Sequence, residues 1–248
     1  MTSGTHGVFM KPSDLTVYAV SLHGTPIRYT SEANLVPLCA YASTLEEDKR
    51  KQLENEGWLF DDHENNISSL NPWFAELTAI FTIINYDTSR LVGNAQYRKR
   101  WTESAIASSD ETILYVPEPL LFCQSVAEQM AAGHTSFDGA EMMLEAAATT
   151  HNFPFTVQEI EKVLHQNFFY GYLMARGPSD QYKIFMKTLL ECMAPVWHMH
   201  KKQIMTIDGY DRRAIAFMAE RMMTAMILYR EKIFDFKIMS APIEFVGP

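Results

Sequence analysis

A short apolar run followed closely by three cations is the feature that most constrains this chain. Leu91–Ala95 (LVGNA) has the composition of a buried strand, and Arg98–Arg100 (RKR) begins three residues after it ends. In an α/β fold, ligands bind beyond the carboxyl ends of the strands. A strand that delivers three cations to that edge predicts a site for an anion. The simpler alternative is a solvated loop at the end of a strand.

The net charge shows that this basic cluster is not a by-product of composition. The chain has 248 residues, a formal net charge of −9 and a pI near 5.4. A general nucleic-acid binder needs a basic face, so the balance of charge argues against nucleic acid as a partner. Contact with phosphate groups must therefore be local.

Cysteine usage and hydropathy point to the cytoplasm. Cys39, Cys123 and Cys192 are far apart and form no CxxC motif, which is typical of a reduced chain without a disulfide framework. The first 15 residues lack the apolar core of a signal peptide, and no apolar run is long enough to span a bilayer. We expect a cytoplasmic protein, with peripheral attachment to the inner membrane left open.

The order of the predicted elements indicates the fold class. We expect residues 1–14 to form a flexible arm and residues 15–248 to form a single domain. The expected strands are Leu15–Ser21, Leu91–Ala95, Thr112–Val116, Phe168–Ala175 and Asp235–Met239, with Leu35–Ala42 either a strand or a helical turn. The expected helices are Asn71–Tyr86, Gln124–Ala132, Phe137–Thr150, Thr156–Gln166, Ser179–His200 and Tyr210–Arg230. Strands alternate with helices early and helices dominate late, which predicts an α/β fold with a mostly parallel sheet.

One carboxylate lies within the most apolar of these helices. Asn71 suits the helix cap and Pro72 its first turn, so that Glu76 falls on an apolar row. Burying a carboxylate is costly unless it is paired, and Arg98 or Arg100 is the available partner. The pair could organise a site or be purely structural.

Several familiar motifs are missing from the sequence. Neither the dinucleotide fingerprint GxGxxG nor the P-loop follows the first strand. The acidic cluster Asp61–Glu64 (DDHE) resembles a metal site, but adjacent residues rarely converge on one ion. A hydrolase is not favoured, because GxSxG is absent and no Ser/His or Cys/His spacing is recognisable.

Five segments together resemble a bacterial family that recurs among capsular-polysaccharide and O-antigen biosynthesis proteins. That family is long filed as a domain of unknown function and includes galactofuranosyltransferase-like members. The most specific segment is Asn66–Ala79 (NISSLNPWFAELTA). The others are Val92–Trp101, Gly133–Asp138, Phe169–Ala175 and Arg213–Met223 (RAIAFMAERMM). The order and spacing of these segments agree over nearly the whole chain.

The resemblance implies a glycosyltransferase with a GT-A-like, Rossmann-type sheet. It implies a nucleotide-sugar donor, expected to be UDP-linked, and a glycan or lipid-linked glycan acceptor in surface-polysaccharide biosynthesis. Many such enzymes hold a divalent metal with a DxD motif at a strand end, but here that position carries Gln96–Arg100. A departing diphosphate can be stabilised by a metal or by fixed cations. We therefore expect transfer without a bound metal or other cofactor.

These arguments define two sets of candidate residues. The donor and diphosphate set is Arg98, Lys99, Tyr97, Glu76, Asn71, Arg213 and His23. The candidate general base for the acceptor hydroxyl is Asp138 with His134, followed by Glu220. The structural alternatives are a loop cap for His134 and an ion pair with a neighbouring helix for Glu220.

Three positions depart from the family pattern. Gln96 stands where the family has His, Tyr170 or Gly171 replaces an Asn, and Ala216 replaces a Gly. These changes favour an alternative from another class, a non-catalytic module that binds a sugar nucleotide or a glycan within a polysaccharide assembly complex.

Overall fold

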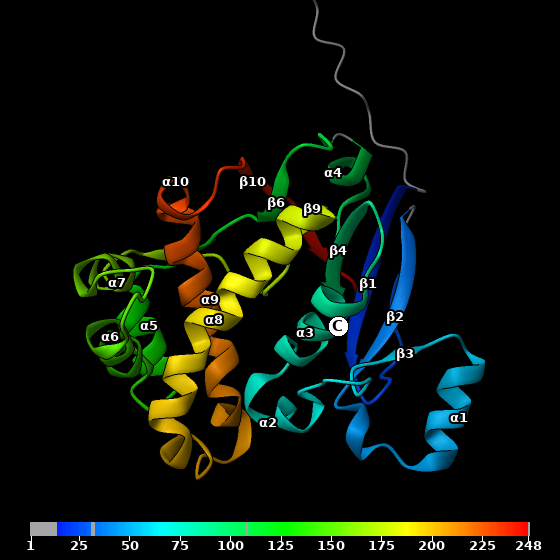
Figure 1. The fold of residues 1–248 in the computed structure, drawn as a ribbon, viewed down its shortest axis with the longest axis horizontal. Coiled ribbons are helices and arrows are strands. Elements are labelled where there is room, and N and C mark those ends of the chain that lie inside the picture. Colours follow the sequence, from blue (N-terminus) through cyan, green and yellow to red (C-terminus); the bar gives the residue numbers. More distant parts are fainter. Residues whose placement is uncertain (1–13, 31–32, 108, 248) are drawn as a thin grey trace, which may run out of the picture.

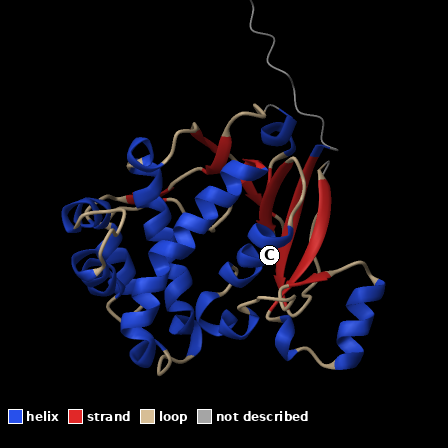
Figure 2. Ribbon diagram, in the orientation of Figure 1, coloured by secondary structure: helices blue, strands red, loops and turns tan. Residues whose placement is uncertain are grey.

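A computed structural model describes residues 14–30, 33–107 and 109–247. The predicted arm at residues 1–14 therefore lies outside the described residues except for Asp14. Figures 1 and 2 show the sheet on one side of the molecule and most of the helices gathered on the other.

Nine strands form the main sheet of the described chain. They are β1 (Leu15–Leu22), β2 (Asn34–Ala40), β3 (Leu59–Phe60), β4 (Leu91–Gln96), β5 (Lys99–Trp101), β6 (Leu114–Pro117), β9 (Arg176–Pro178), β10 (Ile238–Ala241) and β11 (Ile243–Phe245). A separate pair joins β7 (Leu120–Leu121) to β8 (Phe168–Phe169).

The main path of the sheet runs β10-β6-β9-β4-β1-β2-β3 and is mostly parallel. Strands β4, β1, β2 and β3 are parallel neighbours, as are β10 and β6, whereas β9 runs antiparallel to both β4 and β6. The predicted α/β class with a mostly parallel sheet is confirmed. Because β1, β2 and β4 are parallel, their carboxyl ends open at the same edge of the sheet.

The helices concentrate in the second half of the chain, as predicted. They are α1 (Glu47–Asn55), α2 (Asn71–Phe74), α3 (Leu77–Tyr86), α4 (Glu103–Ala107), α5 (Val126–Gly133), α6 (Gly139–Thr149), α7 (Val157–Leu164), α8 (Ser179–Ile204), α9 (Ala214–Leu228) and α10 (Arg230–Ile233). Short 3₁₀ turns occupy Ala42–Thr44, Ser68–Leu70 and Gly209–Arg213. Among the described helices, none combines the length and apolarity needed to cross a bilayer.

The two faces of the sheet pack into different cores because side chains alternate along a strand. In β4, Val92 belongs to the larger core with α3, α8 and α9, whereas Leu91 and Ala95 belong to a smaller core with Trp101. Gly93 stands between them at a close approach, where an added Cβ would lie 2.6 Å from the Cβ of Arg176.

The strand predicted at Asp235–Met239 begins three residues later, as β10. Two predicted elements next to the cavity differ more strongly from the structure. The helix predicted at Asn71–Tyr86 breaks into α2 and α3 at Ala75, whose φ of 45° and ψ of −128° are not helical. The strand predicted at Phe168–Ala175 is a strand only over β8, and then becomes irregular at Tyr172 and Leu173, with φ of 75° and 48°. The carbonyl oxygen of Ala75 accepts from Asn71 and Thr78, which lie within four residues, whereas the N–H of Tyr172 donates to Glu220, 48 positions away. The local pattern of apolar residues reveals neither break.

Asn94 ties the irregular segment to the central strand. Its amide nitrogen donates to the carbonyl oxygen of Leu173 at 2.8 Å, and its amide oxygen accepts from the Ala175 N–H at 3.0 Å and the Tyr182 hydroxyl at 3.2 Å. Asn94 is 1% exposed. The regular strand β4 thereby fixes the position of the irregular segment beside it.

Replacing Asn94 with Ala should lower the free energy of unfolding by about 2–4 kcal/mol, because a buried N–H, C=O and hydroxyl lose their partner together. Urea denaturation measures the change. Asn85→Ala is the matched control, since Asn85 is exposed and bonds only within its own helix. Equal stability of the two variants would contradict the role assigned to Asn94.

Candidate active site

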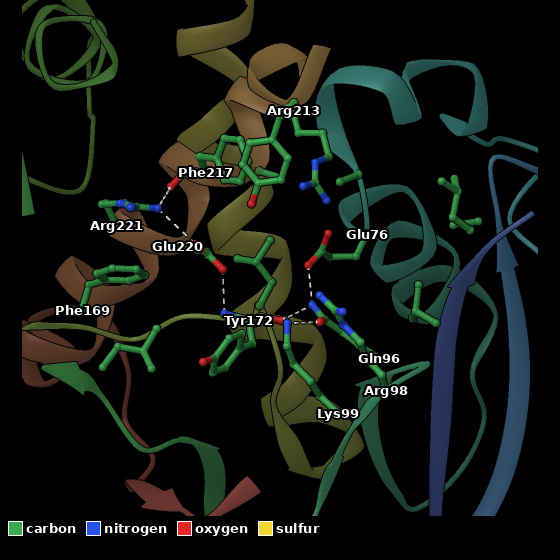
Figure 3. Close-up of a pocket in the computed structure, with 18 of the residues that line it drawn as sticks. Glu76, Gln96, Arg98, Lys99, Phe169, Tyr172, Arg213, Phe217, Glu220 and Arg221 are labelled. Atoms are coloured by element: carbon green, nitrogen blue, oxygen red, sulfur yellow. Dashed lines mark hydrogen bonds and ion pairs between the residues drawn. The ribbon is translucent and has the colours of Figure 1, made fainter. Parts of the chain in front are cut away.

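A cavity of about 440 Å³ opens at the carboxyl ends of β1, β2 and β4. It is bounded by the junction of α2 and α3, by the irregular segment after β8 and by α9 (Figure 3). Its lining includes Leu22, Ala40, Gln96, Leu120, Phe122, Phe169, Tyr172 and Phe217 together with the charged residues described below. The sheet thus places the cavity at the edge where α/β folds bind ligands.

Most of the residues predicted for the site line this cavity. They are Asn71, Glu76, Tyr97, Arg98, Lys99, His134, Arg213 and Glu220. They come from segments that are far apart in the chain and that the fold brings together. Their roles in binding or catalysis stay predictions.

Two predicted residues lie elsewhere. His23 stacks on Tyr41 with ring centroids 5.1 Å apart and shares a hydrogen bond of 3.0 Å with the Thr44 hydroxyl. Asp138 is the N-cap of α6, where it accepts the Glu141 N–H at 2.9 Å, and it lines a separate hollow. The capping role follows from its position just before α6, so Asp138 is not placed to act in the main cavity.

A chain of hydrogen bonds links Glu76 to Lys99. The Gln96 amide nitrogen donates to Oε1 of Glu76 at 2.6 Å and to the carbonyl oxygen of Tyr172 at 3.1 Å. The Lys99 ammonium donates to the Gln96 amide oxygen at 2.6 Å and lies 4.2 Å from the centroid of the Tyr172 ring. Gln96 therefore bridges an acid and a base across the end of β4.

The ion pair predicted for Glu76 does not form. Arg100 instead pairs with Glu244, at 2.7 Å, and with Glu103. No carboxylate of the described residues lies within ion-pairing distance of Arg98 or Arg213. Figure 3 shows Arg98, Lys99 and Arg213 directed toward the space next to Glu76. The cavity therefore holds two guanidinium groups without a carboxylate partner, which suits an anionic ligand.

Burial moves the pKa values of Glu76 and Lys99 toward each other. Burial raises the pKa of Glu76 above 4.5, and the charge of Glu220 adds to the rise, whereas Lys99 and Arg213 oppose it. Burial lowers the pKa of Lys99 below 10.5, against the charges of Glu76 and Glu220. Perturbed titrating groups of opposite sign within one cavity are typical of functional sites.

Glu220 is held on both of its oxygens. Oε1 accepts the backbone N–H of Tyr172 at 2.7 Å, and Oε2 pairs with Arg221 at 3.0 Å. Arg221 is 2% exposed and lies over the Phe169 ring at 4.1 Å. Glu220 thus fixes the irregular segment that forms one wall of the cavity, and its ion pair is with the adjacent residue of its own helix.

His134 has a different carboxylate partner from the one predicted. Its Nδ1 lies 3.0 Å from Oδ1 of Asp211, whose other oxygen accepts the Ser136 N–H at 3.1 Å. The imidazole stacks on Phe217 with centroids 3.9 Å apart and is 5% exposed. Burial lowers the pKa of His134, although hydrogen bonding to Asp211 acts in the opposite direction. The lowered pKa favours the neutral imidazole, and Asp211 orients the ring in the cavity wall.

A second buried carboxylate holds the helix break that presents Glu76. Asp61 is fully buried and accepts the N–H groups of Tyr41 and Ala42, both at 2.9 Å, and the hydroxyls of Ser68 and Thr78. The Thr78 hydroxyl in turn accepts from the Asn71 amide at 2.9 Å.

The same Asn71 amide donates to the carbonyl oxygen of Ala75 at 2.8 Å. Asn71 is therefore not a helix cap, and its amide instead stabilises the break between α2 and α3. The turn at Ala75 places Glu76 at the start of α3 and in the wall of the cavity.

The residues at the end of β4 do not fit a divalent cation. Metal sites for diphosphates supply carboxylate oxygens, whereas this strand end supplies an amide and two cations. The described part of the chain contains no group of three or more His, Cys, Asp or Glu side chains placed to hold a metal ion. Glu220, the other acid of the cavity, has both oxygens engaged.

Sequence reasoning missed Asp61, Asp211, Tyr172 and Arg221. Asp61 directly follows the apolar segment Trp58–Phe60, which is the signal that could have separated it from a solvated loop. Asp211 meets His134 from 77 positions away, and no local pattern indicates that pairing.

Comparison with known proteins supports a glycosyltransferase fold. A family model described as a domain of unknown function (DUF4422) matches residues 38–231. The apo structure of WbbM, described as a bifunctional glycosyltransferase, is similar at a TM-score of 0.66 and 16% identity; the match covers 94% of this chain but 45% of WbbM. The glycosyltransferase GlyE of Streptococcus pneumoniae TIGR4 matches 92% of this chain and 45% of its own at 9% identity, with a TM-score of 0.35, too low to indicate a shared fold. A search of curated proteins finds no match.

Replacing Asp61 with Ala should lower the free energy of unfolding by about 3 kcal/mol or more, because two backbone N–H groups and two hydroxyls lose a charged acceptor. Thermal and urea unfolding measure this loss. Asp62→Ala is the control, since Asp62 is a partly buried neighbour that pairs only with Arg50. The Asp61 network would be refuted if both variants were equally stable.

Proposed function

The chain belongs to the DUF4422 family, and we propose that it is a glycosyltransferase that moves a sugar from a nucleotide-sugar donor to a glycan acceptor. The observation that carries the proposal is the convergence of Arg98, Lys99 and Arg213 on Glu76 within the cavity at the strand ends. The likeness of the fold to WbbM supports it. The sequence resemblance favours a UDP-linked donor, and an acceptor that is a glycan or lipid-linked glycan of a surface polysaccharide.

The three cations are proposed to bind the donor diphosphate. When the glycosidic bond to the diphosphate breaks, negative charge grows on the departing oxygens, and preorganised cations stabilise it. The guanidinium groups of Arg98 and Arg213 lack carboxylate partners in the described chain, so they retain their hydrogen-bonding capacity for phosphate oxygens. Lys99 is fixed by Gln96 and adds a point charge.

Glu76 is proposed to accept the proton of the acceptor hydroxyl. In a direct displacement, the acceptor oxygen bonds to the anomeric carbon, the bond to the diphosphate breaks, and the hydroxyl proton passes to a base. One oxygen of Glu76 is held by Gln96, and its raised pKa makes the carboxylate a stronger base than an exposed one. His134, whose pKa is lowered by burial and whose ring is oriented by Asp211, is the second candidate.

The opposite wall of the cavity is proposed to receive the acceptor. Leu120, Phe122, Phe169 and Phe217 give it an apolar and aromatic surface, distinct from the charged wall formed by the end of β4. Phe122 and Phe169 are stacked with ring centroids 5.2 Å apart. Such a surface matches the C–H faces of sugar rings better than it matches a diphosphate.

A non-catalytic binding module is the second candidate function. Gln96 engages both Glu76 and Lys99 and occupies the position where the family has His. An acid and a base tied to one neutral amide could serve binding alone. Release of free sugar from UDP-, GDP- and dTDP-sugars by the purified protein separates the two functions, because a pure binding module would shift in melting temperature without turnover.

Arg98→Ala should weaken nucleoside diphosphate binding by about 100-fold while the protein stays folded, because a charged, bidentate phosphate contact is lost. Isothermal titration with UDP and GDP measures the affinity, and circular dichroism checks the fold. The control is Arg90→Ala, which removes an exposed arginine at the other end of β4. Unchanged affinity would refute the assignment, and turnover that EDTA abolishes and Mn²⁺ restores would refute metal-free transfer.

The rate of transfer should be bell-shaped in pH. Glu76 must be deprotonated, so the acid limb should lie above the usual carboxyl range, because its pKa is raised above 4.5. Lys99 must be protonated, so the alkaline limb should lie below 10.5, because its pKa is lowered. Lys99→Arg should move the alkaline limb to higher pH, because arginine stays charged. A limb that the variant leaves in place would assign that limb to another group.

A further inference from the structure

A cluster of cations and exposed apolar side chains stands beside the cavity, where α8 turns into α9. We define this basic corner as Lys201, Lys202, Met205, Tyr210 and Arg212. The first three lie in the last turn of α8 and just after it, and the last two lie in the 3₁₀ turn Gly209–Arg213. Figure 1 shows the end of α8, this turn and α2 at the same end of the molecule.

A pair of tryptophans joins the two halves of the basic corner. Trp73 of α2 and Trp197 of α8 lie with ring centroids 5.7 Å apart. The Lys201 ammonium lies 5.7 Å from the Trp197 ring, and the Arg212 guanidinium lies 5.0 Å from the Trp73 ring. Cations carried by separate segments are thus held next to each other over one aromatic base.

The cations of the basic corner are not neutralised locally. Lys201, Lys202 and Arg212 are exposed and form no ion pair within the described residues. Of the two acids in residues 201–213, Asp211 faces inward to His134, which leaves Asp208 exposed. In a chain with a net charge of −9, the corner is a positive island.

Apolar side chains project from the same island. Met205 is 48% exposed and Tyr210 is 64% exposed, although large apolar side chains are costly to leave in water. Tyr210 also lines the cavity, so the basic corner forms part of its rim. A surface that combines cations, methionine and aromatic rings fits the boundary between lipid headgroups and acyl chains.

We propose that the basic corner docks this protein on an anionic lipid bilayer. The lysines and the arginine meet the headgroup phosphates, while Met205 and Tyr210 enter the boundary region. The acidic remainder of the chain is repelled by the same membrane, and this repulsion orients the protein with the basic corner toward the bilayer. The rim of the cavity is then held at the lipid surface. This docking goes beyond the proposed transfer reaction, since it is measured without any sugar.

Co-sedimentation with vesicles tests the proposal. The protein should bind vesicles of phosphatidylcholine and phosphatidylglycerol, and binding to phosphatidylcholine alone should be at least about tenfold weaker. Reversing the charge at Lys201, Lys202 and Arg212 to Glu should reduce binding to the anionic vesicles by about tenfold or more. The matched control reverses Lys49, Lys51 and Lys187, cations of α1 and α8 outside the corner, and should bind within about twofold of the parent. Lys51 and Lys187 are exposed and Lys49 is half-buried.

Two further variants keep the test decisive. Lys201→Gln, Lys202→Gln and Arg212→Gln together remove the charge while keeping polar side chains, so this variant should still lower vesicle binding if the Glu variant unfolds. Met205→Ser should weaken binding to anionic vesicles at constant charge. Equal binding to both vesicle types, equal loss in the control variant, or binding unaffected by any of these changes would overturn the proposal. The same variants should bind nucleoside diphosphates with the affinity of the parent. This titration separates failure of the docking proposal from failure of the proposed function.

Discussion

Two carboxylates hold the backbone at points where it leaves regular structure near the cavity. Asp61 accepts the N–H of Tyr41, a residue with φ of 62°, and Glu220 accepts the N–H of Tyr172, with φ of 75°. Left-handed backbone is unfavourable for such residues, and a buried charge without donors is more costly still. The carboxylates accept the N–H groups of the left-handed residues, and those N–H groups supply the donors that the carboxylates need. The irregular segments near the cavity therefore depend on these two acids.

The same physics divides the charges of the cavity into two kinds. Glu76 and Lys99 are bridged by the neutral amide of Gln96 through short hydrogen bonds, and burial shifts the pKa of the acid upward and that of the base downward. Arg98 and Arg213 have no carboxylate partner in the described chain and keep their charge directed into the cavity. The first group sets the geometry of the strand end, while the second provides the positive potential that a diphosphate would meet.

Local pattern was enough wherever an element is fixed by its own residues. The alternation in Leu15–Ser21 and the apolar run Leu91–Ala95 predict β1 and β4 to within one residue, because the period of the side chains determines which face is buried. The predicted α7 is marked by its capping box at Thr156 and Glu159. Pattern failed at Tyr172, whose N–H donates to Glu220 from 48 positions away, and at Ala75, where hydrogen bonds from Asn71 and Thr78 hold a non-helical turn.

The sequence by itself determined the mostly parallel α/β class and most of the charged residues that line the cavity, because the ends of strands and the placement of charges are visible in the local sequence. Tertiary structure alone decided which charges meet. It paired Arg100 with Glu244 rather than Glu76, and His134 with Asp211 rather than Asp138. Partners chosen across 77 or 144 positions depend on how strands and helices stack, and no short-range spacing encodes that choice.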